Sequence, residues 1–177
     1  MANYITILRI VLIFPVLILV SPTSALSNWI ALFIFIVAGL TDHLDGYLAR
    51  KTGTTSNLGG LLDLIADKLL ICITILFLIS FGDRDALVIP SIIIIARELI
   101  ISSFRQFVAE NSDFSNFKVS LIGKSKTTIQ ITALSFLIVS PNFLDTFYSI
   151  TVFLFWLASF LSVYSLFDYL RSYSNKI

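Results

Sequence analysis

Four aspartates stand in two closely spaced pairs within one short stretch of this chain. Asp42 and Asp45 are three residues apart, and Asp63 and Asp67 are four residues apart. On an α-helix these spacings place both members of a pair on one face, so two helices can aim four carboxylates at one point. Carboxylate oxygens are hard ligands that suit Mg2+ or Mn2+, and the single Cys and single His of the chain disfavour zinc. The pattern predicts a divalent metal site.

The residues beside the acids indicate what such a metal would hold. Gly46 and Ala49 follow Asp45 by one and four residues and leave that helix surface without bulk. A large group can therefore approach the backbone. Arg50 adds a planar fork of donors that suits phosphate oxygens. Together these residues predict a substrate that contains a diphosphate.

The composition places this charged segment in an apolar protein. The chain is 57% hydrophobic and 13% charged, with a mean hydropathy of +0.95, whereas soluble domains carry about 25% charged residues. We therefore expect an integral membrane protein with the lipid bilayer as its surroundings and no nucleic-acid partner. A charge at mid-bilayer costs roughly 2.5 to 3.5 kcal/mol on insertion scales, so charges retained there predict a function.

The elements that must position the aspartates are long helices. A spanning helix needs about 20 largely apolar residues. The chain offers six apolar stretches, at residues 5–20, 29–40, 61–80, 86–109, 126–140 and 147–170. The second reaches bilayer length only if it continues through the aspartate segment. We predict an all-α polytopic membrane protein with six transmembrane helices in one domain, residues 1–177.

The Lys and Arg residues predict the orientation of these helices. If both termini lie in the cytosol, every Lys and Arg except Arg84 falls on or toward the cytosolic side, as the positive-inside rule requires. The four aspartates then lie near the same face. We expect a multi-pass protein of the cell (inner) membrane whose active site opens to the cytosol.

The segment from Asp42 to Asp67 resembles the signature of a known family. The spacing D-x2-D-G-x2-A-R-x8-G-x3-D-x3-D runs from Asp42 through Gly59 to Asp67 and is similar to the signature of the CDP-alcohol phosphatidyltransferases. The segments ARELIISSFRQFVAE and IGKSKTTIQ, with the N-terminal Asn3, Thr6 and Arg9, resemble the bacterial branch of that family. One departure is His43, where an aromatic or other apolar residue is expected.

The resemblance implies transfer of a phosphatidyl group from CDP-diacylglycerol to sn-glycerol 3-phosphate, with release of CMP. It implies a homodimer and two ions, Mg2+ or Mn2+, held by the four aspartates, with Asp67 also acting as the general base. The implied CDP-lipid-binding residues are Asp42, Asp45, Gly46, Ala49, Arg50, Gly59 and Asp63.

An acceptor that is itself a phosphate monoester needs a cationic pocket of its own. The candidates are Arg97, Arg105, Lys124 and Lys126. Arg105 has the alternative of binding lipid headgroups beside the membrane. Glu98 is either part of this pocket or a structural partner that orients a neighbouring arginine.

Two other functions stay open from the sequence. A sister enzyme would use the same metal site with another alcohol, such as phosphatidylglycerol in cardiolipin synthesis, inositol phosphate or serine. A divalent cation transporter would use intramembrane carboxylates as ion sites in transit, but internal repeats with broken helices are typical of such transporters, and we find no repeat here.

Overall fold

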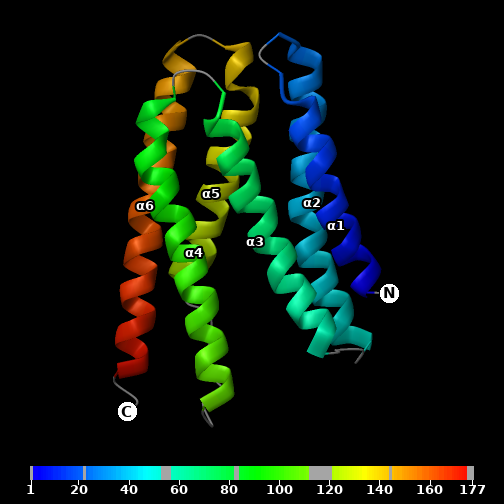
Figure 1. Ribbon diagram of the computed structural model, residues 1–177, viewed down its shortest axis with the longest axis vertical. Helices are drawn as coiled ribbons and strands as arrows, with labels where there is room; N and C mark the ends of the chain where they lie inside the picture. Colours follow the sequence, from blue (N-terminus) through cyan, green and yellow to red (C-terminus); the bar gives the residue numbers. More distant parts are fainter. Residues whose placement is uncertain are drawn as a thin grey trace.

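The part of the chain that the structure describes is built from six α-helices and one short 3-10 helix (Figure 1). This computed structural model describes residues 2–21, 23–52, 57–81, 84–111, 121–143 and 145–174. The elements are α1 (Ala2–Leu19), α2 (Ala25–Thr52), α3 (Asn57–Ile79), α4 (Asp85–Asn111), α5 (Leu121–Val139), η1 (Ser140–Asn142) and α6 (Asp145–Ser174). Side chains are described within these ranges except at 2–5, 42–52, 57, 58, 60, 61, 63, 109–111, 121–125, 145, 146 and 172. The predicted all-α fold is confirmed for these residues.

The helices form two groups that α5 joins. In Figure 1, α1, α2 and α3 lie on one side, and α4 and α6 lie on the other. α5 contacts α2 and α3 as well as α6, so it belongs to both groups. The two ends of the chain lie at the same, lower end of the bundle, and the α1–α2, α3–α4 and α5–α6 connections lie at the upper end (Figure 1).

α2 continues without a break through the first aspartate pair. Its residues 25–40 carry no charge, and the helix then runs on to Thr52. α3 begins at Asn57 and carries the second aspartate pair in its first half. From Leu69 to Ile79 α3 has no charged residue. Both helices are therefore apolar toward the upper end and charged toward the lower end.

α5 is longer at its start than the hydropathy predicts. The apolar stretch begins at Lys126, whereas the helix begins at Leu121, five residues earlier. Lys126 is thus preceded by a full turn of helix. It is 3% exposed, so it lies inside the bundle and not at its rim.

The core and a polar clamp hold the upper half of the bundle together. Phe35, Ile75, Leu134 and Phe155, from four different helices, are at most 1% exposed. Asn28 is fully buried. Its Oδ1 accepts from the Ser21 N–H at 2.8 Å, and its Nδ2 donates to the Ser21 carbonyl at 2.8 Å and to Asn142 Oδ1 at 2.9 Å. One side chain therefore ties the α1–α2 turn to η1.

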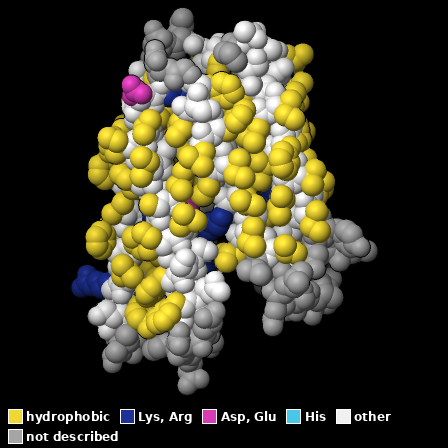
Figure 2. Space-filling view, in the orientation of Figure 1, with side chains coloured by type: hydrophobic (Ala, Val, Ile, Leu, Met, Phe, Trp, Pro, Cys, Tyr) yellow, Lys and Arg dark blue, Asp and Glu magenta, His cyan; other side chains and the backbone are white. Residues whose placement is uncertain are grey.

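The outer surface is largely apolar. Figure 2 shows hydrophobic side chains over the middle of the visible face, and large residues such as Ile18, Phe33, Phe153 and Phe160 are more than 60% exposed. Within the described residues, two helical stretches, Asp85–Val108 and Phe147–Arg171, are long and apolar enough to cross a membrane, and Thr6–Leu19 and Ala25–Thr41 are shorter apolar helices. Water-soluble monomers rarely expose so much apolar surface, so these features indicate membrane association.

Candidate active site

The two aspartate pairs lie on neighbouring helices. Residues 42 and 45 are helical within α2, residues 63 and 67 are helical within α3, and the two helices contact each other. The side chains of Asp42, Asp45 and Asp63 lie outside the described residues. The predicted convergence of four carboxylates therefore stays a prediction, and Asp67 is the member whose surroundings can be described.

Several other predicted positions also lie outside the described side chains. These are Gly46, Ala49 and Arg50 of the predicted CDP-lipid site, Lys124 of the predicted acceptor site, and His43. Gly59 is described and half-buried near the start of α3. Thus the predicted acceptor site is better defined than the predicted CDP-lipid site.

Asp67 lies where the two groups of helices meet. Its side chain is 38% exposed, and its Oδ2 is 3.4 Å from the Lys68 ammonium. It also lines an enclosed cavity of about 20 Å3 together with Arg9, Gly39 and Thr127, from α1, α2 and α5. Such a volume is enough for about one water molecule. Asp67 therefore has a solvated side and a confined side.

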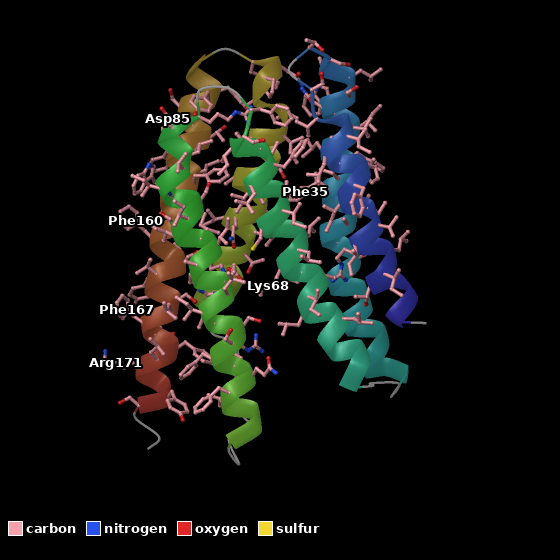
Figure 3. The ribbon with its side chains drawn as sticks, viewed as in Figure 1. Phe35, Lys68, Asp85, Phe160, Phe167 and Arg171 are labelled. Atoms are coloured by element: carbon pink, nitrogen blue, oxygen red, sulfur yellow. The ribbon has the colours of Figure 1, made fainter. Side chains whose placement is uncertain are left out.

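Lys68 connects Asp67 to the second group of helices. Figure 3 shows its side chain between α3 and α4, and its ammonium donates to Glu98 Oε2. The Lys68 side chain is 21% exposed, whereas that of Glu98 is 2% exposed. One ammonium thus lies between a buried carboxylate and a partly solvated one.

Glu98 is the centre of a buried ionic cluster, which we define as Lys68, Arg97, Glu98 and Lys126. Besides Lys68, Glu98 accepts from Lys126 Nζ through Oε1, and Arg97 Nη1 lies 3.4 Å from the same oxygen. The cluster joins α3, α4 and α5. Buried charges are tolerated when they are paired and hydrogen-bonded, and a single carboxylate here serves three cations.

Arg97 extends the cluster to α6. Its Nε donates to the Ser162 carbonyl at 3.2 Å, and its Nη2 donates to Ser165 Oγ at 2.8 Å. Arg97 is 8% exposed. These bonds hold the guanidinium in one orientation, so Arg97 is a fixed positive charge and not a mobile surface arginine.

Arg105 lies apart from the ionic cluster, toward the lower end of α4. It is seven residues after Glu98, which at 100° per residue returns to almost the same face and at 1.5 Å per residue is about 10 Å along the axis. Its side chain is exposed. Of the four predicted acceptor residues, the structure therefore brings Arg97 and Lys126 together and places Arg105 separately on the same helix as Arg97.

Sequence reasoning assigns no role at this site to Lys68 or Arg9, and it leaves Glu98 open between the acceptor pocket and a structural partner of an arginine. Arg9 is 1% exposed and lines the cavity beside Asp67. Their sequence signal is charge inside an apolar helix, but the partners of such charges are fixed only by helix packing.

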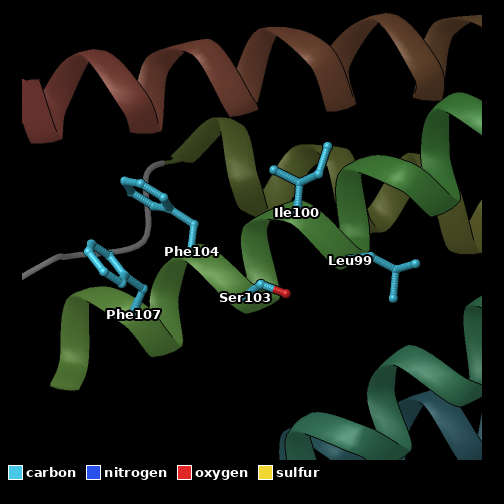
Figure 4. A pocket seen from close by; sticks show the side chains of 5 residues that line it. All are labelled: Leu99, Ile100, Ser103, Phe104 and Phe107. Carbon is cyan, nitrogen blue, oxygen red and sulfur yellow. The ribbon is translucent and has the colours of Figure 1, made fainter.

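A second hollow on α4 has a different character. It is an open groove of about 490 Å3 lined by Leu99, Ile100, Ser103, Phe104 and Phe107 (Figure 4). Ser103 is its one polar lining residue. A groove without charges is unsuited to phosphate groups, so we assign the chemistry to the region around Asp67 and the ionic cluster.

Asp67 is the one aspartate of the motif whose side chain is described, and its partly exposed carboxylate offers oxygen ligands. Among the described side chains, no three His, Cys, Asp or Glu residues gather at one point; the side chains of Asp42, Asp45 and Asp63 lie outside the described residues. The chain has a single Cys and a single His, so oxygen ligands predominate. This chemistry fits Mg2+ or Mn2+.

Comparison with known proteins places this arrangement in a family. The model for CDP-alcohol phosphatidyltransferases matches residues 1–164. A protein from Haemophilus influenzae named CDP-diacylglycerol--glycerol-3-phosphate 3-phosphatidyltransferase is 37% identical over 169 residues, which cover 95% of this chain and 90% of that protein. Proteins of the same name from Shigella flexneri serotype 5b and Escherichia coli strain K12 are 38% identical over 168 residues, covering 94% of this chain and 91% of each. The chain belongs to the CDP-alcohol phosphatidyltransferase family.

Proposed function

We propose that this protein transfers the phosphatidyl group of CDP-diacylglycerol to sn-glycerol 3-phosphate, giving phosphatidylglycerol phosphate and CMP. The observation that carries the proposal is the 37% to 38% identity, over nearly the whole chain, to proteins named for this reaction. The structure supports it with an aspartate beside a buried ionic cluster that holds more cations than carboxylates.

The reaction is an in-line displacement at phosphorus. A hydroxyl oxygen of glycerol 3-phosphate attacks the phosphorus that bears the diacylglycerol, and the bond from that phosphorus to the CMP oxygen breaks. The hydroxyl proton goes to Asp67, which we propose as the general base. A base needs to reach the proton it removes, and the 38% exposed Asp67 side chain is accessible to a bound acceptor.

Members of this family generally use divalent metal ions. In our proposal Asp42, Asp45, Asp63 and Asp67 hold Mg2+ or Mn2+, and two ions suit the diphosphate of the donor. Metal bound there supplies positive charge that stabilises the attacking and leaving oxygens.

The CDP-lipid site in this proposal includes the small residues and the arginine that follow the first aspartate pair. Gly46 and Ala49 leave room for the cytidine, and Arg50 binds its phosphates. The complete proposed set is Asp42, Asp45, Gly46, Ala49, Arg50, Gly59 and Asp63.

The acceptor phosphate site in this proposal consists of Arg97, Arg105, Lys124 and Lys126. Among the described side chains of this region, three cations, Lys68, Arg97 and Lys126, face two carboxylates, Asp67 and Glu98. An excess of cations favours a phosphate monoester as ligand. Arg105, exposed toward the lower end, is placed to meet the acceptor from solvent.

We propose the same membrane arrangement that the sequence predicts. Residues 1–177 form one domain with six spans in the cell (inner) membrane, both termini in the cytosol, the active site opening to the cytosol, and two copies forming a homodimer. Both ends of the chain lie at one end of the bundle (Figure 1), which supports termini on a common side.

The decisive experiment measures CMP release by purified protein in detergent with CDP-diacylglycerol and Mg2+ or Mn2+. Glycerol 3-phosphate is compared with inositol phosphate, serine and phosphatidylglycerol, each with and without chelator. We expect turnover only with glycerol 3-phosphate and only with metal. Turnover with another acceptor would replace the acceptor assignment, and no turnover with any alcohol would overturn the proposed function.

A further inference from the structure

Among the side chains that the structure describes, the Lys68 ammonium has two carboxylate partners, and they hold it unequally. It donates to Glu98 Oε2 and lies 3.4 Å from Asp67 Oδ2, which is the longer of the two contacts. Coulomb attraction rises as distance and dielectric fall. Glu98 is 2% exposed and Asp67 is 38% exposed, so both factors favour the bond to Glu98.

We propose that Glu98 is a positioning residue for Asp67. Glu98 binds the Lys68 ammonium from α4 and so weakens the ion pair between Lys68 and Asp67. The Asp67 carboxylate therefore stays available to the reacting groups. This inference rests on the proposed role of Asp67 in phosphatidyl transfer.

The other partners of Glu98 make this position stable. Lys126 and Arg97 approach Oε1, whereas Lys68 approaches Oε2. Arg97 is itself fixed to α6 through Ser162 and Ser165. The carboxylate is therefore held through its other oxygen, and neither Lys126 nor Arg97 is paired with the oxygen that binds Lys68.

The alternative is that Glu98 only neutralises buried cations so that the bundle folds, or only holds Lys126 and Arg97 for the acceptor phosphate. These roles predict different consequences. A folding role predicts less folded protein with unchanged kinetics per folded molecule, and an acceptor role predicts a higher KM for glycerol 3-phosphate. Control of Asp67 through Lys68 predicts a lower kcat that depends on Lys68.

The test compares four proteins, the wild type, Glu98→Gln, Lys68→Met and the double variant, by kcat and by KM for glycerol 3-phosphate. Loss of a residue that orients a reacting group typically costs about 10-fold to 100-fold, so we expect Glu98→Gln to lower kcat by about that factor. Without Glu98, Lys68 pairs with Asp67 alone. Adding Lys68→Met to Glu98→Gln should therefore raise kcat again, to about five times that of Glu98→Gln or more.

Thr74→Val is the matched control. Thr74 is a fully buried polar residue of the same helix as Lys68, and its hydroxyl donates to the Leu70 carbonyl of that helix. We expect its kcat and KM to match the wild type. If Glu98→Gln yields little folded protein, Glu98→Asp keeps the charge that balances the cations but shortens the reach to Lys68, and the same recovery on adding Lys68→Met is expected.

A double variant no faster than Glu98→Gln, or a loss confined to KM, would overturn the positioning role. Asp67→Asn separates this failure from failure of the proposed function. If the wild type releases CMP and Asp67→Asn does not, only the positioning inference is at stake. An inactive wild type would overturn both. An active Asp67→Asn would remove the general-base role on which the positioning inference rests, and would leave phosphatidyl transfer itself standing.

Discussion

At the scale of single residues, the Asp67 side chain is partly exposed to solvent and lies beside a lysine and a small cavity. The Lys68 ammonium is 3.4 Å from Asp67 Oδ2, and the Asp67 side chain also lines the small cavity that Arg9, Gly39 and Thr127 share. A ligand that arrives from solvent can therefore reach this carboxylate, whereas the cavity holds about one water molecule.

The substitution Asp67→Asn should abolish turnover while largely sparing binding of CDP-diacylglycerol. The amide keeps the size of the side chain but accepts no proton, and loss of a general base costs about 100-fold to 10,000-fold. CMP release measures the first effect, and binding of the CDP-lipid to detergent-solubilised protein measures the second. Equal loss of both would contradict the assignment of Asp67 as the base.

The substitution Arg105→Ala should mainly weaken binding of the acceptor, glycerol 3-phosphate. A hydrogen bond to a charged group contributes about 1.5 to 3 kcal/mol, so the KM for glycerol 3-phosphate should rise about tenfold or more at nearly unchanged kcat. Arg171, an equally exposed arginine on α6, provides the control, because Arg171→Ala should leave both constants as in the wild type. If the two variants behave alike, Arg105 is only a lipid-facing charge.

The aspartate motif could be predicted from the sequence, whereas the ion-pair partners of Glu98 could not. The carboxylate motif is local, so the four aspartates and a predicted metal site follow from spacing within 26 residues of chain, whereas the role of Asp67 as a base comes from the family resemblance. Two of the partners of Glu98 are 30 and 28 residues away, at Lys68 and Lys126. Such pairs depend on which helices pack together and at what depth, and neither is written in the spacing of one segment.

At the scale of elements, helix type was predictable and helix ends were not. Long apolar stretches predict helices wherever they occur, and the structure has a helix at each. α2 and α5 nevertheless extend well beyond their apolar stretches, to Thr52 and from Leu121. Helical hydrogen bonding continues through polar residues that hydropathy excludes, so the aspartate-bearing turns of α2 are extensions of an apolar helix.

The substitution Asn28→Ala should destabilise the upper end of the bundle without changing the chemistry. It removes three hydrogen bonds and leaves Ser21 and Asn142 with unpaired groups, at a cost of about 1 to 3 kcal/mol for each buried group left unsatisfied. Thermal unfolding in detergent should show a lower midpoint, and kcat at low temperature should be unchanged. Asn142→Ala, which breaks one of these three bonds, should cause a smaller shift.

At the scale of the whole molecule, an apolar exterior encloses a charged interior. Phe33, Phe153 and Phe160 are exposed, whereas Arg9, Glu98 and Lys126 are at most 3% exposed. Charged residues are almost never fully buried unless they are paired, and Glu98 and Lys126 are paired with each other here. The exterior suits hydrocarbon, and the interior suits ionic substrates.

The protein should therefore stay with the membrane when peripheral proteins are removed. After expression in bacteria, washing the membranes with alkaline carbonate should leave it in the pellet, and detergent should release it. A peripheral membrane protein carried through the same wash is the control. Recovery of this protein in the carbonate supernatant would rule out the proposed six-span arrangement.

The uncharged half of α3 has a consequence for the shape of the lipid around the protein. Leu69 to Ile79 is eleven residues, or about 16 Å at 1.5 Å per residue, and a hydrocarbon layer is about 30 Å thick. In the proposed membrane arrangement, the uncharged part of α3 matches little more than one leaflet, and the other leaflet would thin or give way to water there. Dissolved glycerol 3-phosphate would then reach a lipid headgroup through water, without moving its charge into the hydrocarbon.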